Sequence, residues 1–175
     1  PRPYFAVAGT QATDARLDRL LHETLGDTAA GDCLLIVAST ALDITELEAR
    51  TTAEGGFHFE HSTALDLLAE RLRQRHGFAE AFTLNTACTS AANGLLYGAR
   101  LLASAAYQKV LVLAFETPSA VAQQGFGALD LTSPSGAYRP FHPERDALIP
   151  GERYCATLLG REPGPAPRPS PPGGS

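Results

Sequence analysis

The chain has 175 residues, a formal net charge of −5, and 44% hydrophobic against 19% charged residues. This is the length of one domain with enough apolar content for a packed core, so wholesale disorder is excluded. Nucleic-acid binding is disfavoured, because phosphate contacts need clustered Lys and Arg and Lys109 is the only lysine. The three cysteines form no CxxC pair, which argues against a zinc site and a disulfide framework and favours a reducing cytoplasm.

The sequence predicts neither a membrane span nor an N-terminal signal peptide. No apolar run reaches the roughly 20 residues of a membrane span, and the first ten residues lack the charged-then-apolar layout of a signal peptide. We therefore expect no membrane span and a cytoplasmic location. Residues 161–175 are rich in Pro and Gly and predict a disordered tail, which leaves residues 1–160 as the folded domain.

Apolar runs and helical spacing alternate along residues 1–160. The expected strands are 4–9, 33–40, 82–87, 110–115 and 154–159, and the expected helices are 13–25, 62–76 and 88–106. This β-α-β-α-β-α-β-β order predicts an α/β fold with a mostly parallel five-stranded sheet whose last strand is antiparallel. The connection of residues 117–153 is too long for a plain loop and is expected to carry function or a short helix.

The helix expected over residues 88–106 is apolar on all sides. Its only charged side chain is Arg100, and Gly94 and Gly98 allow neighbours to approach closely. A helix that is apolar all round must be buried all round. One sheet covers only one side, and exposing the other would forgo several kcal/mol at about 25 cal/mol per Å². The pattern therefore predicts a second layer, for which this chain has no residues left.

Cys88 lies where an expected strand ends and this helix begins. Backbone N–H groups and the helix dipole favour a thiolate at such a position and offer donors to an oxyanion, which suits a nucleophile. The alternative is that Cys88 is a small buried hydrophobe, as most free cysteines are. Cys33 and Cys155 lie inside apolar strands and are expected in the core.

The segment 85–90 (NTACTS) resembles the nucleophile segment TAC(A/S/T)S of the β-ketoacyl synthases. Further blocks that match the family in register are Ala99-Arg100, Ala114-Phe115-Glu116 (family GGAE), 125–129 (GFGAL, family GFGA-x-x-L), 139–146 (RPFHPERD, family RPFD-x-x-RDG) and 150–152 (PGE, at the start of the family's GEG). These blocks extend from residue 85 to residue 152. The first 80 residues match only in element order and apolar pattern.

The resemblance implies a thiolase-like fold, in which two β-α-β-α-β-α-β-β halves stack around two central helices. This chain would be the N-terminal half only, with Cys88 as the catalytic nucleophile. The family's two catalytic histidines and an oxyanion donor belong to the second half, and none of the five histidines here lies in a matching motif. Phe126 would be a gate residue at the acyl pocket beside Cys88, and its alternative is a core aromatic.

Three departures from the family pattern replace a glycine. Ala147 stands for the last residue of RDG, Arg153 for the last of GEG, and Ala91 for the glycine common after Thr89-Ser90. They indicate relaxed demands around the active-site entrance or a divergent branch of the family. None of them changes Cys88.

Two groups of polar side chains are candidates for additional sites. His58 and His61 have an i, i+3 spacing that imitates a metal pair, but without a third ligand a solvated or interface loop is favoured, and no metal site is expected. The basic side chains at 71, 73 and 75 could attract an acidic carrier protein. Only Arg71 and Arg75 share a helix face, so a solvated face is favoured.

The resemblance predicts a half-length ketosynthase-like subunit of fatty-acid or polyketide-type chain elongation, similar to those of aryl-polyene systems. It would form a heterodimer with a full-length ketosynthase, with residues 82–86 as candidate contact, and shape the acyl tunnel as a chain length factor does. The acyl groups would arrive on an acyl carrier protein that carries the phosphopantetheine, and no cofactor of its own is expected.

Two alternatives to this subunit role stay open. In the first, Cys88 accepts an acyl group while another chain supplies the missing histidines; autonomous condensation is not expected, because it needs those histidines and an oxyanion donor. In the second, the chain is a truncated, non-functional remnant.

Overall fold

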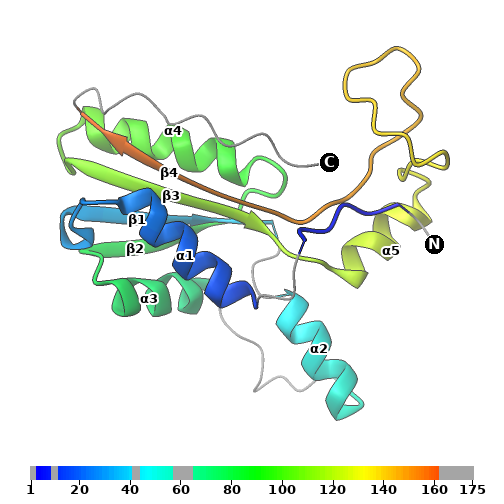
Figure 1. Ribbon diagram of the computed structural model, residues 1–175, viewed down its shortest axis with the longest axis horizontal. Coiled ribbons are helices and arrows are strands. Elements are labelled where there is room, and N and C mark those ends of the chain that lie inside the picture. The colour runs from blue at the N-terminus through cyan, green and yellow to red at the C-terminus, as the bar shows by residue number, and fades with distance from the viewer. Residues whose placement is uncertain (1–2, 9–11, 41–43, 57–64, 162–175) are drawn as a thin grey trace.

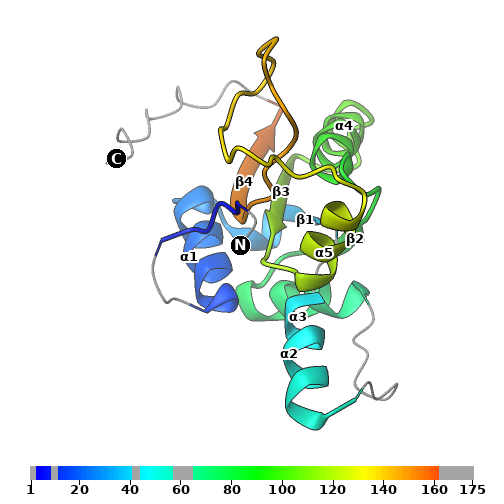
Figure 2. The same cartoon turned by 90° about the vertical axis from the view of Figure 1, so that its right-hand side faces the viewer.

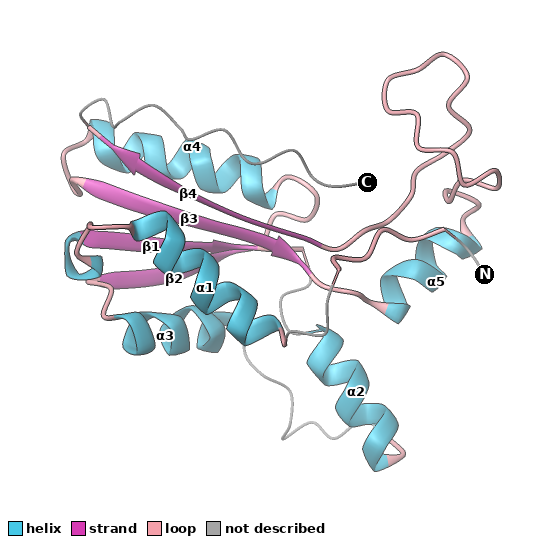
Figure 3. Cartoon of the chain, in the orientation of Figure 1, coloured by secondary structure: helices cyan, strands magenta, loops and turns pink. Residues whose placement is uncertain are grey.

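The computed structural model describes residues 3–8, 12–40, 44–56 and 65–161, and shows one mixed sheet with helices on both faces (Figures 1 and 3). The α-helices are α1 (Thr13–Leu25), α2 (Ile44–Glu54), α3 (Leu65–His76), α4 (Ser90–Ala103) and α5 (Ala120–Ala128), and a short 3-10 helix covers Ala30–Asp32. The strands are β1 (Cys33–Ala38), β2 (Glu80–Leu84), β3 (Lys109–Glu116) and β4 (Arg153–Gly160). The expected α/β class is therefore confirmed.

The sheet has the strand order β2-β1-β3-β4. Strand β1 pairs in parallel with β2 and with β3, while β4 runs antiparallel to β3 with Thr157 opposite Val112. All six residues of β1 are buried, as the apolar run from Cys33 predicted for a strand covered on both faces. The mostly parallel sheet with an antiparallel last strand is confirmed.

The expected fifth strand, residues 4–9, does not form within the described residues. Phe5 makes one isolated bridge to Gly151, with its N–H donating to the Pro150 carbonyl at 3.0 Å and its carbonyl accepting from the Glu152 N–H at 2.7 Å. The Val7 N–H, the next one along this segment, donates to the Glu152 carboxylate at 3.0 Å and not to the backbone of a neighbouring strand. The side chain ends the ladder after one bridge, so the described sheet has four strands rather than five.

Helices α1 and α3 cover one face of the sheet, and α4 covers the other (Figures 1 and 2). The core under α1 and α3 includes Leu17, Leu35 and Leu72, each at most 1% exposed. The core under α4 is smaller and is built on Ile36, Val110 and Val112, with Leu102 from the helix. This alternation follows from the strand period of two, which sends successive β1 side chains to opposite faces.

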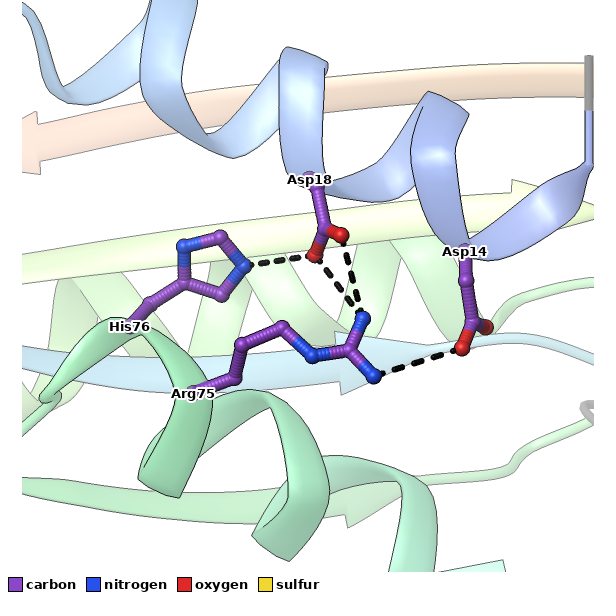
Figure 4. A network of polar contacts seen from close by, with 4 residues as sticks. All are labelled: Asp14, Asp18, Arg75 and His76. Atoms are coloured by element: carbon purple, nitrogen blue, oxygen red, sulfur yellow. Dashed lines mark hydrogen bonds and ion pairs between the residues drawn. The ribbon is translucent and has the colours of Figure 1, made fainter.

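A polar network ties α1 to α3 at their outer sides (Figure 4). The Arg75 guanidinium pairs with the carboxylates of Asp18 at 3.0 Å and Asp14 at 3.4 Å, and His76 Nε2 lies 2.8 Å from Asp18 Oδ1. Burial raises the pKa of Asp18, but the hydrogen bonds from His76 and Arg75 outweigh it and hold that pKa below its ordinary value. The outer surface of this layer is thus polar and internally paired.

The remaining elements differ from expectation in detail. The expected helix 13–25 is confirmed, and α4 is shorter than the expected helix 88–106. Helix α5 lies in the long connection of residues 117–153, as predicted, whereas α2 was not predicted. The expected tail, from residue 162 onward, and the first residues of the expected helix 62–76 lie outside the described residues.

Candidate functional site

Cys88 lies on the turn that joins the end of β2 to the start of α4, and its side chain is exposed. The preceding residue, Ala87, has φ 53°, a left-handed conformation that is unfavourable for alanine by about 1–2 kcal/mol. An isolated parallel bridge joins Thr86 and Cys88 around it. The backbone therefore turns sharply at Ala87 and presents the next side chain outward, and the described residues do not bury Cys88.

Hydrogen bonds from two polar side chains hold this strained turn. Asn85 Oδ1 accepts from the Ala87 N–H at 3.1 Å, while its Nδ2 donates to the Thr40 carbonyl at 2.8 Å beyond the end of β1. The buried Ser90 hydroxyl donates to the Ala87 carbonyl at 2.6 Å and accepts from the Thr86 N–H at 2.9 Å. The strain at Ala87 is thereby offset by its neighbours.

A second set of contacts closes the first turn of α4. The Thr89 hydroxyl donates to the Thr86 carbonyl at 2.7 Å, and Asn93 Nδ2 donates to the Thr86 hydroxyl at 2.8 Å. Asn85 and Ser90 belong to the matched segment 85–90, and the motif alone does not predict these contacts. Their signal was the run of Asn, Thr and Ser between a strand and a helix, which is typical of side chains that hydrogen-bond to local backbone.

Helix α4 lies directly on the sheet because two glycines face it. A Cβ at Gly94 would come within 2.9 Å of Val112 Cγ1, and one at Gly98 within 2.8 Å of Leu159 Cδ1. Ser90 and Leu102 continue the same buried stripe at four-residue spacing. This contact fixes the helix, and with it the turn that carries Cys88.

The opposite side of the helix is exposed and, apart from Arg100, apolar, and we call it the outward face of α4. Leu95, Leu96 and Tyr97 on it are 40%, 46% and 45% exposed. Ala92, Ala99 and Ala103 extend this face, and the exposed Arg100 is the one charged side chain on it. The helix that the sequence predicts to be buried all round is thus covered on one side only by the described residues.

The carboxyl ends of the parallel strands carry a further polar contact beside the turn. The Thr40 N–H donates to Glu116 Oε1 at 2.5 Å, which links the end of β3 to the residues after β1. Asn85 bonds the carbonyl of the same threonine, so the ends of three strands are joined through Thr40. Glu116 is the glutamate of the matched 114–116 block and has a structural contact here.

Phe126 lies on α5 and is half-buried. Helix α5 follows the end of β3, at the same end of the sheet as the turn before α4 (Figures 1 and 2). The described contacts do not test whether its ring gates an acyl pocket beside Cys88, so this role stays a prediction.

The other two cysteines differ in burial. Cys33 is fully buried, as expected, and burial raises the pKa of its thiol. Cys155 is exposed, so the prediction that it belongs to the core is wrong. It lies on β4, which pairs on one side with β3 and forms an edge of the described sheet. An apolar run on an edge strand does not guarantee that each side chain is covered.

The basic stripe of α3 is largely engaged within the chain. Arg73 donates to Glu70 at 2.7 Å through both Nε and Nη2, and Arg75 pairs with α1, while Arg71 is exposed. This agrees with a solvated face. His58 and His61 lie outside the described residues, and within the described part of the chain no group of three or more His, Cys, Asp or Glu could hold a metal ion.

No family model matches the chain. Over 117 residues it is 29% identical to the hybrid PKS-NRPS synthetase TAS1 of Botryobasidium botryosum, a match that covers 63% of this chain and 7% of the synthetase.

Solved structures resemble it over more of its length. A ketosynthase (ApeO) in complex with its chain length factor (ApeC) from Xenorhabdus doucetiae matches with a TM-score of 0.64 and 22% identity, over 91% of this chain and 47% of that one. A β-ketoacyl synthase from Burkholderia phymatum STM815 matches with a TM-score of 0.63 and 19% identity, over 82% of this chain and 40% of that one. The chain spans less than half the length of these proteins and has the thiolase-like fold of ketosynthases. The fold that the sequence resemblance implies is therefore confirmed.

The helices among the described residues include none long and apolar enough to cross a membrane.

Proposed function

We propose that this chain is a half-length ketosynthase-like subunit that completes or shapes the acyl tunnel of a full-length ketosynthase, in the manner of a chain length factor. The outward face of α4 carries the proposal. Its leucines and tyrosine form an exposed apolar surface beside the turn of Cys88, and surfaces of this kind mark interaction sites. A second thiolase-like half, supplied by the ketosynthase, is the partner whose chemistry and size fit it.

The connection after α5 supports the same proposal. Leu129, Tyr138 and Phe141 are 70%, 66% and 98% exposed, and Phe141 has φ 61°, an unfavourable conformation for an aromatic residue. This segment projects from the sheet end in Figure 1. Large apolar side chains held outward in this way serve as contacts in an assembled complex.

The reaction served is carbon–carbon bond formation on acyl groups carried by the phosphopantetheine of an acyl carrier protein, in the cytoplasm. Decarboxylation and oxyanion stabilisation need histidines and a backbone donor, which the partner contributes. The subunit itself then supplies the wall of the tunnel around Cys88 and Phe126, and needs no cofactor.

The assembly is tested by light scattering together with binding of an apolar dye. The purified chain alone should bind the dye and self-associate. On titration with a full-length ketosynthase from the same genome it should form a one-to-one complex and release the dye. A monomer that binds no dye and forms no complex contradicts the proposal.

The exposure of Cys88 on a fixed turn favours a second candidate function, that of acyl acceptor. The thiolate attacks the thioester carbonyl, a new thioester forms at Sγ, and the phosphopantetheine thiolate leaves and takes up the proton that Cys88 lost. Incubation with acyl carrier thioesters should add one acyl group to the intact mass. The Cys88→Ala variant should remove it and Cys155→Ala, the matched exposed cysteine, should keep it. An equal adduct on Cys88→Ala, or none on wild type, contradicts this function.

A further inference from the structure

The start of α5 is held by a side chain from a distant element, Glu48 of α2. Its Oε1 accepts from the Ser119 hydroxyl and from the Val121 N–H, each at 2.9 Å, and its Oε2 accepts from the Ala120 N–H at 2.9 Å. Ser119 in turn accepts from the Ala122 N–H at 3.0 Å. The first three amides of the helix are therefore satisfied by one carboxylate and one hydroxyl.

These contacts are the kind that fixes a helix. The first N–H groups of a helix have no partner within it, and a carboxylate there is favoured both by hydrogen bonding and by the helix dipole. Burial raises the pKa of Glu48, but the hydrogen bonds from Val121, Ala120 and Ser119 outweigh it and lower that pKa below its ordinary value. The carboxylate is thus held in the charged form that the cap needs.

A second contact joins the same two elements. The Thr45 hydroxyl, one turn before Glu48, lies 2.7 Å from the Thr117 hydroxyl and also contacts the Pro118 carbonyl. Helix α2 otherwise projects away from the sheet (Figures 1 and 2). Its attachment to the residues that begin α5 is therefore a mechanical link between a projecting helix and the helix that bears Phe126.

We propose that Glu48 is a positioning residue that fixes α5 and, through it, sets where Phe126 stands and which acyl chain lengths Cys88 accepts. The effect on acyl chain length rests on the proposed function, whereas the positioning of α5 by Glu48 does not. Loss of the carboxylate frees two helix N–H groups, those of Ala120 and Val121, together with the Ser119 hydroxyl, and lets the first turn of α5 fray. The ring one and a half turns further along then loses its fixed place.

The positioning is tested with a single fluorophore, because the chain has no tryptophan. In a Phe126→Trp background, Glu48→Gln should shift the emission to longer wavelength and raise acrylamide quenching about twofold or more. Glu54→Gln, which removes another carboxylate from α2, should leave both unchanged. Unchanged emission and quenching in Glu48→Gln overturn the proposal.

Hydrogen exchange gives the same test without the tryptophan. Exchange at the Ala120 and Val121 amides should accelerate at least tenfold in Glu48→Gln, and exchange at the Ala122 amide should accelerate in Ser119→Ala. All three amides should stay unchanged in Glu54→Gln. Slow exchange in Glu48→Gln at the Ala120 and Val121 amides overturns the proposed cap.

Selectivity is measured as the ratio of Cys88 acylation by a short and a long acyl carrier thioester. Glu48→Gln should change that ratio several-fold, and Glu54→Gln should not. If fluorescence shows that Glu48→Gln makes the introduced indole mobile and the ratio is nevertheless unchanged, the proposed effect of Glu48 on selectivity is wrong. Absence of any acylation in wild type overturns it too, together with the acyl-acceptor function, and leaves the positioning to stand on fluorescence and exchange.

Discussion

The helix layers on the two faces of the sheet have different outer surfaces. On the face under α1 and α3, apolar side chains point inward and the outer surface carries paired charges such as Asp18 and Arg75. On the other face, α4 packs on the sheet through Gly94 and Gly98 but turns leucines and a tyrosine to the outside. The first layer ends in a surface suited to water, and the second ends in a surface suited to another protein layer. The difference supports the proposed interface on the outward face of α4.

The largest expected effect compares one leucine from each face. Leu35 is fully buried under α1 and α3, and Leu35→Ala should lower the free energy of unfolding of the isolated chain by about 2–5 kcal/mol. Leu96 is 46% exposed, and Leu96→Ala should change it by less than about 0.5 kcal/mol. Urea denaturation measures both. Equal losses would mean that α4 is already covered.

The close approach of α4 to the sheet gives the next effect. Gly98→Ala drives a Cβ to 2.8 Å from Leu159 Cδ1 and should lower the free energy of unfolding by about 1–3 kcal/mol. Gly125 on α5 has no atom within 4 Å of an added Cβ, so Gly125→Ala should be neutral or stabilising by up to about 1 kcal/mol. Thermal melts of the two variants decide. A neutral Gly98→Ala would show that α4 is loosely packed.

The strained turn before α4 predicts a small gain. Ala87→Gly removes the Cβ that disfavours φ 53° and should raise the free energy of unfolding by up to about 1 kcal/mol, after the greater freedom of glycine in the unfolded chain is subtracted. The matched control is Ala91→Gly, within α4, which should be destabilising by a similar amount. A loss of stability in Ala87→Gly would mean that the turn is not strained.

The smallest effect is the pH dependence of the α1–α3 network. The pKa of Asp18 is lowered in the folded chain, so the unfolded chain binds this proton first as the pH falls. The stability that Asp18 contributes is complete above its ordinary pKa of 3.8 and is lost as the pH falls through the lower folded value. Asp18→Asn should flatten the acid limb of the stability profile, whereas Asp27→Asn, in the exposed turn after α1, should not. An unchanged acid limb in Asp18→Asn contradicts the network.

The sequence predicts those elements whose pattern arises from burial. The run Cys33–Ala38 and the leucine spacing of Thr13–Leu25 identify β1 and α1, because each has a buried face. Helix α2 was missed, because it projects from the body and has little apolar periodicity to detect. Residues 4–9 were assigned to a strand that the Glu152 carboxylate interrupts, a side-chain contact over 145 positions that no local pattern reveals.

The candidate site, too, could be predicted only in part from the sequence. Cys88 could be placed at a strand–helix junction from the sequence, and the structure puts it there with an exposed side chain. The left-handed Ala87 and the bond from Asn85 to Thr40 could not be foreseen, since they depend on a partner 45 positions away. The Glu48 cap of α5 spans more than 70 positions and was likewise beyond sequence reasoning.

The proposed function makes the outward face of α4 a protein interface. This interface is tested most directly by measuring the affinity of a full-length ketosynthase from the same genome for two matched variants. Leu96 on α4 and Leu67 on α3 are 46% and 47% exposed and lie on opposite sides of the sheet. Leu96→Asp should weaken the complex at least a hundredfold, and Leu67→Asp should leave the dissociation constant within about twofold of wild type. Equal affinities for the two variants would contradict the account.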